Sequence, residues 1–238
     1  SKVLYPEDST EVGKELRLEQ QYFFASASIH DAIRVFYPDT DKPDLTTFAD
    51  KITFQLNDTH PVIGIPELMR IMIDEYGYDW DTAWEVTHKT FNYTCHTLLP
   101  EALEVWPASL IGKLLPRHLE IIERINKQFV SELEAKGASE DQIKRMLILT
   151  DDEHPVVRMA YLATYAGSNV NGVAELHSQL LKDVTLRDFS DVYPAKFKNV
   201  TNGIAYRRWL LASNPELCKL LDETIGTGYK LSLIHISE

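Results

Sequence analysis

The chain has 238 residues, of which 44% are apolar and 25% charged, the balance of an ordinary soluble globular protein. This composition excludes collagen, disordered tails and disulfide miniproteins. At roughly 150 residues per domain, the length allows one large domain or two small ones. The net charge of −12 repels phosphodiester backbones and anionic membrane surfaces, so we expect neither nucleic acid nor a membrane as a partner.

The cysteines and the apolar runs favour a cytoplasmic protein. Cys95 and Cys218 belong neither to a C-x-x-C pair nor to a cluster with zinc spacing, so we expect no metal site. No apolar run approaches the ~18 to 20 residues of a membrane span. Residues 1–10 lack the pattern of a signal peptide, although the chain opens without Met. We interpret it as a fragment of a longer protein.

Helical and strand patterns follow one another in the first part of the chain. Apolar residues at helical spacing predict a long helix over 14–36, and a polar loop is expected over 39–47. Alternating residues then predict a strand over 51–56. Pro66 suits the first turn of a helix that continues over 67–76.

The next segment repeats this order. Asp79 is a plausible N-cap for a helix with Trp80 and Trp84 on one side, and a short strand is expected over 91–95. We interpret the tryptophans as core packing rather than as a sugar platform. Strand, polar turn and helix in succession indicate an α/β fold.

The remaining chain is predicted to be mainly helical. The apolar run 156–165 suits a buried strand or a buried helix. We interpret 188–200 as an ordered surface crossing and a candidate domain border. The expected helices cover 107–136 with an interruption at Pro116, 140–147, 175–182, 207–211 and 215–225.

Two polar clusters stand out. Residues 57–60 (Asn-Asp-Thr-His) follow a predicted strand, and α/β folds bind ligands at the carboxyl ends of their strands. A carboxylate, an amide and an imidazole suit hydroxyl groups, but a turn that caps the next helix explains them equally well. In the second cluster, 92–97, His96 suits a general base or a ligand contact, although a single His is more often structural. The residues alone predict a sugar-sized polar pocket.

Several longer runs are more specific than these clusters. They are GKELRL at 13–18, QLNDTHP at 55–61, IPELMR at 65–70, TLLPEALE at 97–104, LPRHL at 115–119, VNGVA at 170–174, TNG at 201–203 and RRWL at 207–210. Together they closely resemble the glycogen/starch/maltodextrin (alpha-glucan) phosphorylase family, and the resemblance is nearly continuous from Lys2 to about Tyr229. Ala205-Tyr206 stands where the animal enzymes have Thr-Pro, which suggests a bacterial source.

The resemblance implies an α/β fold within a longer enzyme. Residues 1–202 correspond to the later part of a large, doubly wound, glycosyltransferase-B-like N-terminal domain, and 203–230 to the start of the cofactor-binding C-terminal domain. Residues 231–238 have no counterpart, and we interpret them as a non-native tail translated from a sequencing adapter. The family also implies a homodimer for the full-length protein.

The implied reaction is reversible transfer of a terminal α-1,4-linked glucosyl unit to inorganic phosphate. It gives α-glucose 1-phosphate with retained configuration, and the partners are an α-1,4-glucan and phosphate. The family's cofactor is pyridoxal 5'-phosphate, whose own phosphate exchanges a proton with the substrate phosphate. Its attachment lysine is expected outside this chain, so no catalytic residue is assigned here. The alternative for these residues alone is an inactive fragment that is at most a weak glucan-binding module.

The resemblance assigns substrate contacts to four residues. His96 and Asn202 match residues that bond the 6-hydroxyl of the bound glucosyl unit. Asp58 and His60 match residues that line the polar pocket beside the anomeric carbon. A carboxylate there stabilises positive charge in an oxocarbenium-like transition state.

Three further positions are assigned in the same way. Asp8 falls in the family's mobile gate loop, Val173 matches a sugar contact, and Trp209 matches a position near the cofactor.

The gate loop departs from animal enzymes because it lacks their Asn-Phe-Phe. Arg34 is followed by Val35 where animal enzymes pair two arginines on a nucleotide phosphate, so we expect no strong activation by AMP.

Overall fold

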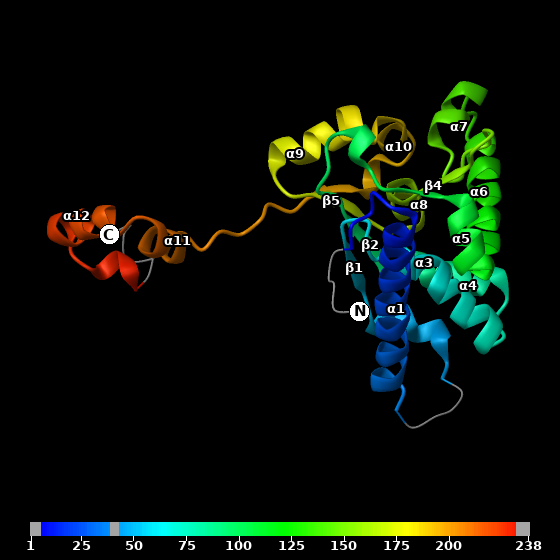
Figure 1. Ribbon diagram of the computed structural model, residues 1–238, viewed down its shortest axis with the longest axis horizontal. Helices are drawn as coiled ribbons and strands as arrows, with labels where there is room; N and C mark the ends of the chain where they lie inside the picture. The colour runs from blue at the N-terminus through cyan, green and yellow to red at the C-terminus, as the bar shows by residue number, and fades with distance from the viewer. Residues whose placement is uncertain (1–5, 39–42, 232–238) are drawn as a thin grey trace. The chain divides into compact units, whose positions relative to one another are not determined.

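The computed structural model describes residues 6–38 and 43–231 and divides the chain into two compact units, 1–200 and 201–238 (Figure 1). Both β-sheets lie in the larger unit. The described residues of the smaller unit are helical or irregular. The expected tail beyond Leu231 and the residues 39–42 of the expected loop lie outside the described residues.

Six short strands form the two sheets of the larger unit. They are β1 (Phe54–Asn57), β2 (Phe91–Thr94), β3 (Val105–Pro107), β4 (Val156–Arg158), β5 (Val170–Gly172) and β6 (Phe197–Asn199). The central sheet is parallel with the order β1-β2-β5-β6, whereas β3 and β4 form an antiparallel pair. The register of the central sheet places Leu56 beside Tyr93, Tyr93 beside Val170 and Val170 beside Phe197.

The two faces of the parallel sheet differ in polarity, because side chains alternate between the faces along each strand. Leu56, Tyr93 and Val170 belong to the face against which helices pack, and all three are buried. Gln55 and Asn171 belong to the opposite face and are exposed and half-buried, respectively. One side of the sheet therefore supplies core, and the other supplies amide groups.

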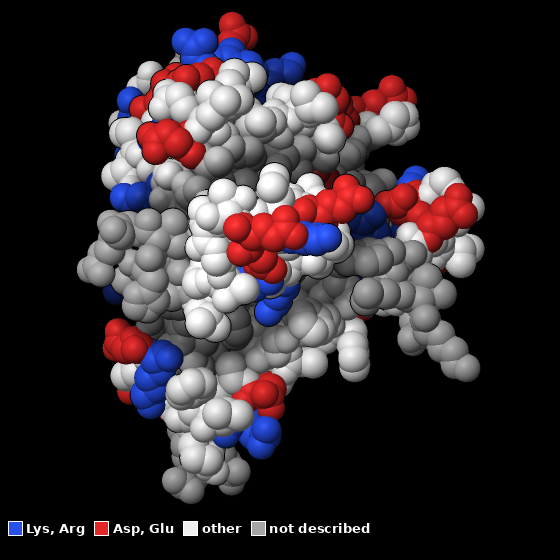
Figure 2. Space-filling view, turned by 90° about the vertical axis from the view of Figure 1, so that its left-hand side faces the viewer, with Lys and Arg blue, Asp and Glu red and all other residues white. Residues whose placement is uncertain are grey.

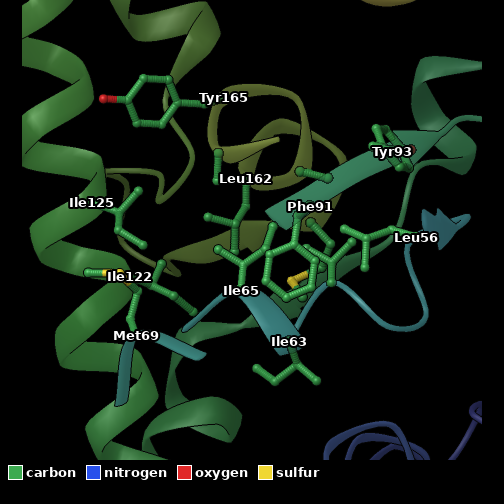
Figure 3. Close-up of a cluster of buried hydrophobic side chains, with 14 of the residues drawn as sticks. Leu56, Ile63, Ile65, Met69, Phe91, Tyr93, Ile122, Ile125, Leu162 and Tyr165 are labelled. Atoms are coloured by element: carbon green, nitrogen blue, oxygen red, sulfur yellow. The ribbon is translucent and has the colours of Figure 1, made fainter. Parts of the chain in front are cut away.

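The larger unit also contains ten α-helices among the described residues. They are α1 (Glu11–Phe36), α2 (Phe48–Lys51), α3 (Gly64–Arg70), α4 (Trp80–Thr90), α5 (Ala108–Leu114), α6 (Pro116–Ala135), α7 (Glu140–Met146), α8 (Met159–Ala166), α9 (Glu175–Leu180) and α10 (Arg187–Val192). The short helix α3 lies at their centre and packs against α1, α4 and α6. Figure 3 shows Ile65 and Met69 of α3 among the buried side chains of the sheet and of α6.

The expected α/β class is confirmed, and so are most of the expected elements. The long first helix is α1, and the Asp79 carboxylate caps α4 by accepting the Thr82 N–H at 2.9 Å. Trp80 is buried, and its Nε1–H donates to the side chain of Gln128 at 2.9 Å. It therefore packs in the core, as the sequence predicts.

Several boundaries differ from the prediction. Lys51 ends a helix, and the strand begins only at Phe54. The apolar run 156–165 is neither one strand nor one helix but β4 followed directly by α8. Helix α3 begins before Pro66 and continues as a π-helical turn, η2 (Ile71–Glu75). Short apolar runs suit both structures, so their packing partners decide between them.

The interpretation of 188–200 as a surface crossing is wrong. This segment contains most of α10 and the whole of β6, which is hydrogen-bonded to β5 in the central sheet. Phe189 and Phe197 are both buried. These two aromatic residues therefore belong to the core. The polar residues between them interrupt the apolar periodicity, so the sequence alone did not predict a buried helix and strand here.

The smaller unit contains α11 (Tyr206–Ser213) and α12 (Pro215–Ile225). Asn214 caps α12 because its Oδ1 accepts the Leu217 N–H at 3.0 Å. Cys218 and Tyr229 are the buried apolar residues of this unit among those described. Both helices agree with the predicted positions.

A buried carboxylate joins three helices of the larger unit. Glu67 of α3 is fully buried and accepts hydrogen bonds from Ser26 of α1 at 2.6 Å, from His118 of α6 at 2.6 Å and from both Arg70 nitrogens at 2.8 and 2.9 Å. Burial alone would raise the pKa of Glu67, but the bonds from Arg70, His118 and Ser26 outweigh it and lower the pKa to about 2. The charged carboxylate is thus the form that the fold selects.

We expect Glu67→Gln to lower the free energy of unfolding by about 3 kcal/mol, because it leaves the buried partners of the carboxylate uncompensated. Glu120→Gln, which removes the exposed partner of Arg117, is the matched control and should change it by less than ~1 kcal/mol. Urea unfolding measures both.

The same carboxylate predicts a pH dependence. Because its pKa falls on folding, its contribution is present above about 4.5, the ordinary value, and is lost as the pH falls toward about 2. The fall in the free energy of unfolding between about pH 4.5 and pH 2 should therefore be smaller in Glu67→Gln than in the wild type. An unchanged acid-side slope in that variant would contradict the assignment.

Candidate functional site

The candidate site lies where β1, β2 and β5 end. The carboxyl ends of parallel strands meet at one edge of a sheet, so the segments that follow these strands lie side by side. His96 follows β2, and its Nε2 lies 2.7 Å from Oδ1 of Asn57, the last residue of β1. The Asp58 N–H donates to the carbonyl of Thr94 at 3.0 Å. These bonds hold the segment after β1 against the segment after β2.

Asp58 has an unusual backbone conformation. Its φ of 65° makes it the one described non-glycine residue with positive φ. Its Oδ1 accepts the N–H of Thr59, a buried residue, at 2.6 Å, which closes the turn. Asp and Asn tolerate the left-handed region better than other side chains, but strain of this kind is concentrated at functional sites. His60 lies further along the same turn and is exposed.

The thiol beside His96 is chemically inert in this arrangement. Cys95 is buried, its N–H donates to the Asn171 carbonyl at 3.0 Å, and its Sγ donates to the Thr97 carbonyl at 3.3 Å. Burial raises the pKa of the Cys95 thiol. The Cys95 backbone therefore helps to hold β2 beside β5, and burial disfavours the thiolate form of its side chain.

Amide and hydroxyl groups form a hydrogen-bonded row on the polar face of the sheet. Gln55 Nε2 donates to Thr94 Oγ1 at 2.8 Å and to Asn171 Oδ1 at 3.2 Å, and Thr94 Oγ1 donates to the same Asn171 oxygen at 2.8 Å. The row crosses β1, β2 and β5. It leaves neutral donors and acceptors beside His96, which suit the hydroxyl groups of a sugar.

Helix α9 contributes a residue that the sequence analysis did not single out. His177 in its first turn receives the Val173 N–H on Nδ1 at 3.3 Å, and its Nε2 lies 3.3 Å from the His96 carbonyl oxygen. Gly172 makes this approach possible, because a Cβ there would lie 2.7 Å from His177 Nδ1 and 2.5 Å from Ser178 Oγ. No sequence motif includes His177. Its position four residues after Val173 is the one signal in the sequence that could have drawn attention to it.

The structure brings together some of the expected residues of the larger unit. Asp58, His96 and Val173 lie at one edge of the central sheet. Asp8 instead bonds to Arg17 of α1, which also donates to the carboxylate of Glu104 at 3.1 Å. The other two expected residues, Asn202 and Trp209, belong to the smaller unit and are exposed.

Other surface features have local explanations. Arg34 donates to Asp31 of its own helix at 2.7 and 3.2 Å. Figure 2 shows acidic side chains spread over one face, with basic ones in small groups between them. Within 6–38 and 43–231, no helix combines the length and apolarity that crossing a membrane requires, and no cluster of His, Cys, Asp and Glu has the arrangement of a metal site.

Comparison with known proteins places this chain in a family. The sequence model of carbohydrate phosphorylases matches residues 1–238. The chain belongs to the carbohydrate phosphorylase family. It is 48% identical over 239 residues to a glycogen phosphorylase of Synechocystis, 48% identical to one of Chlamydia pneumoniae and 46% identical to the brain form of Rattus norvegicus. Each alignment covers 100% of this chain but only 28 or 29% of the relative.

The strained turn at Asp58 gives a stability prediction. Asp58→Gly and Asp58→Ala both remove the carboxylate, but only alanine places a Cβ at a φ of 65°. We expect the glycine variant to be more stable by about 1 kcal/mol in urea unfolding. An alanine variant of equal or greater stability would show that the turn changes its backbone when the carboxylate is removed.

Proposed function

We propose that this chain is a fragment of an α-glucan phosphorylase and contains part of its sugar pocket. The proposed enzyme transfers a terminal α-1,4-linked glucosyl unit to inorganic phosphate, with α-glucose 1-phosphate as the product. The observation that carries the proposal is the convergence of Asp58, His96 and Val173 at the carboxyl edge of the sheet. Relatives named glycogen phosphorylase match the chain along its whole length. The cysteine pattern adds a cytoplasmic location, and the family resemblance adds a homodimer for the full-length protein.

The proposed roles are those that the family resemblance implies, and the chemistry of each group suits them. His96 and Asn202 bond the 6-hydroxyl of the glucosyl unit, and Val173 contacts the sugar. Asp58 stabilises the positive charge that develops at the anomeric carbon, with His60 in the same polar turn. Asp8 belongs to a gate segment at the mouth of the pocket.

Among the described residues, we propose no lysine as the attachment site of pyridoxal 5'-phosphate. Lys196 is the described lysine with a resolved lowering of its pKa, a property of Schiff-base lysines. However, its Nζ donates to the carbonyls of Thr164, Tyr165 and Gly167 at 3.3, 2.5 and 2.8 Å. It therefore has a structural role, and we propose only Trp209 as a contribution to the cofactor's surroundings.

The alternative, an inactive fragment with weak affinity for glucans, is favoured for the 238 residues by themselves. The chain spans 28 or 29% of its relatives, and no residue in it is assigned to protonate the leaving oxygen. We expect no glucose 1-phosphate from maltoheptaose, phosphate and pyridoxal 5'-phosphate with this chain. Turnover that depends on the cofactor would contradict the inactive interpretation.

A chimera tests the proposed function itself. The chain replaces the matched region of the Synechocystis glycogen phosphorylase, and we expect phosphorolysis of maltoheptaose to be retained. His96→Ala in this chimera should lower kcat/KM by roughly 10- to 100-fold, because a buried sugar hydroxyl loses its partner. His154→Ala, in the exposed loop before β4, is the matched control. A fully active His96→Ala chimera would exclude the role proposed for this imidazole.

A further inference from the structure

We infer that His177 is a positioning residue, which holds the two sugar-contacting segments of the site in register through one imidazole. The inference rests on the proposed function for its effect on sugar binding. Its geometric half stands on the structure alone: one ring bonds the segment after β5 at Val173 and the segment after β2 at His96.

The two bonds select one form of the ring. Val173 donates its N–H to Nδ1, so Nδ1 carries no proton. The partner of Nε2 is the carbonyl oxygen of His96, which only accepts, so Nε2 carries the proton. His177 is therefore the neutral Nε2–H tautomer, in which Nδ1 is the acceptor and Nε2–H is the donor. Each nitrogen has one partner.

The surroundings hold this ring in place. Ser178 Oγ donates to the Ala174 carbonyl and to Asn199 Oδ1 of β6, both at 2.9 Å. The absence of a Cβ at Gly172 lets the first turn of α9 approach β5 closely. The first turn of α9 thus contacts the ends of β5 and β6 and the segment after β2. His177 is the member of this turn that reaches the site residues.

Two amide variants separate the two bonds of the ring. The His177→Asn side chain keeps an acceptor near the position of Nδ1 but is too short to reach the His96 carbonyl. The longer His177→Gln side chain reaches toward that carbonyl and gives up the Val173 contact. We compare both with His177→Leu, which removes both bonds. His154→Gln is the control, and urea unfolding verifies that each variant folds.

The geometric half is tested without any ligand. Long-range proton–nitrogen NMR of the imidazole rings should show the Nε2–H tautomer for His177. Hydrogen exchange should accelerate over both 95–99 and 171–175 in His177→Leu, and in the amide variants mainly over the segment that loses its bond. An Nδ1–H tautomer, or unchanged exchange in His177→Leu, would overturn the inference.

The functional half uses maltoheptaose as the probe. We expect His177→Leu to raise the Kd of the chain roughly tenfold, and each amide variant roughly threefold. In a double-mutant cycle, His177→Leu should have a smaller effect in a His96→Ala background, because its role passes through His96. Strictly additive effects would overturn the positioning role. A wild-type chain that does not bind maltoheptaose would contradict the proposed sugar pocket, while the NMR and exchange results would still decide the geometric half.

Discussion

The parallel register of β1, β2 and β5 is the constraint on which the rest of the larger unit depends. It places apolar residues of neighbouring strands in one row, so that a single face of the sheet is buried by helices. The same register brings the three strand ends to one edge, where Asp58, His96 and Val173 follow them. A slip of β1 by one residue against β2 would turn Leu56 toward the polar face and would also separate Asn57 from His96. Core and site are therefore two consequences of one pairing.

The sequence predicted the elements that depend on local chemistry. The cap at Asp79 and the proline at the start of α6 act within one turn, and both elements lie where these residues indicate. β6 was missed because its burial comes from pairing with β5, a contact that depends on distant residues. Composition and family resemblance identified Asp58 and His96. They did not identify His177, because its role depends on the close approach that Gly172 allows.

The chemistry of the site agrees with its place in the fold. The edge of the sheet presents amides, a hydroxyl and imidazoles that bond one another across strands, with one carboxylate held in a strained turn. Neutral groups of this kind discriminate sugar hydroxyls by the direction of their hydrogen bonds and do not need charge. In the proposed reaction, the Asp58 carboxylate is expected to stabilise the positive charge that develops at the anomeric carbon.

Lys196 shows how the structure keeps β6 beside this site. Burial lowers the pKa of Lys196 to about 8, partly opposed by the charge of Glu132, so a charged ammonium there is unfavourable in itself. Three carbonyl oxygens at the end of α8 offset this penalty, and they lie at the negative end of the helix dipole. Because Lys196 directly precedes β6, this contact ties that strand to α8, which packs against the core. Asn199 at the other end of β6 accepts a hydrogen bond from Ser178 of α9 at 2.9 Å, so this strand is held both by α8 and by the turn that carries His177.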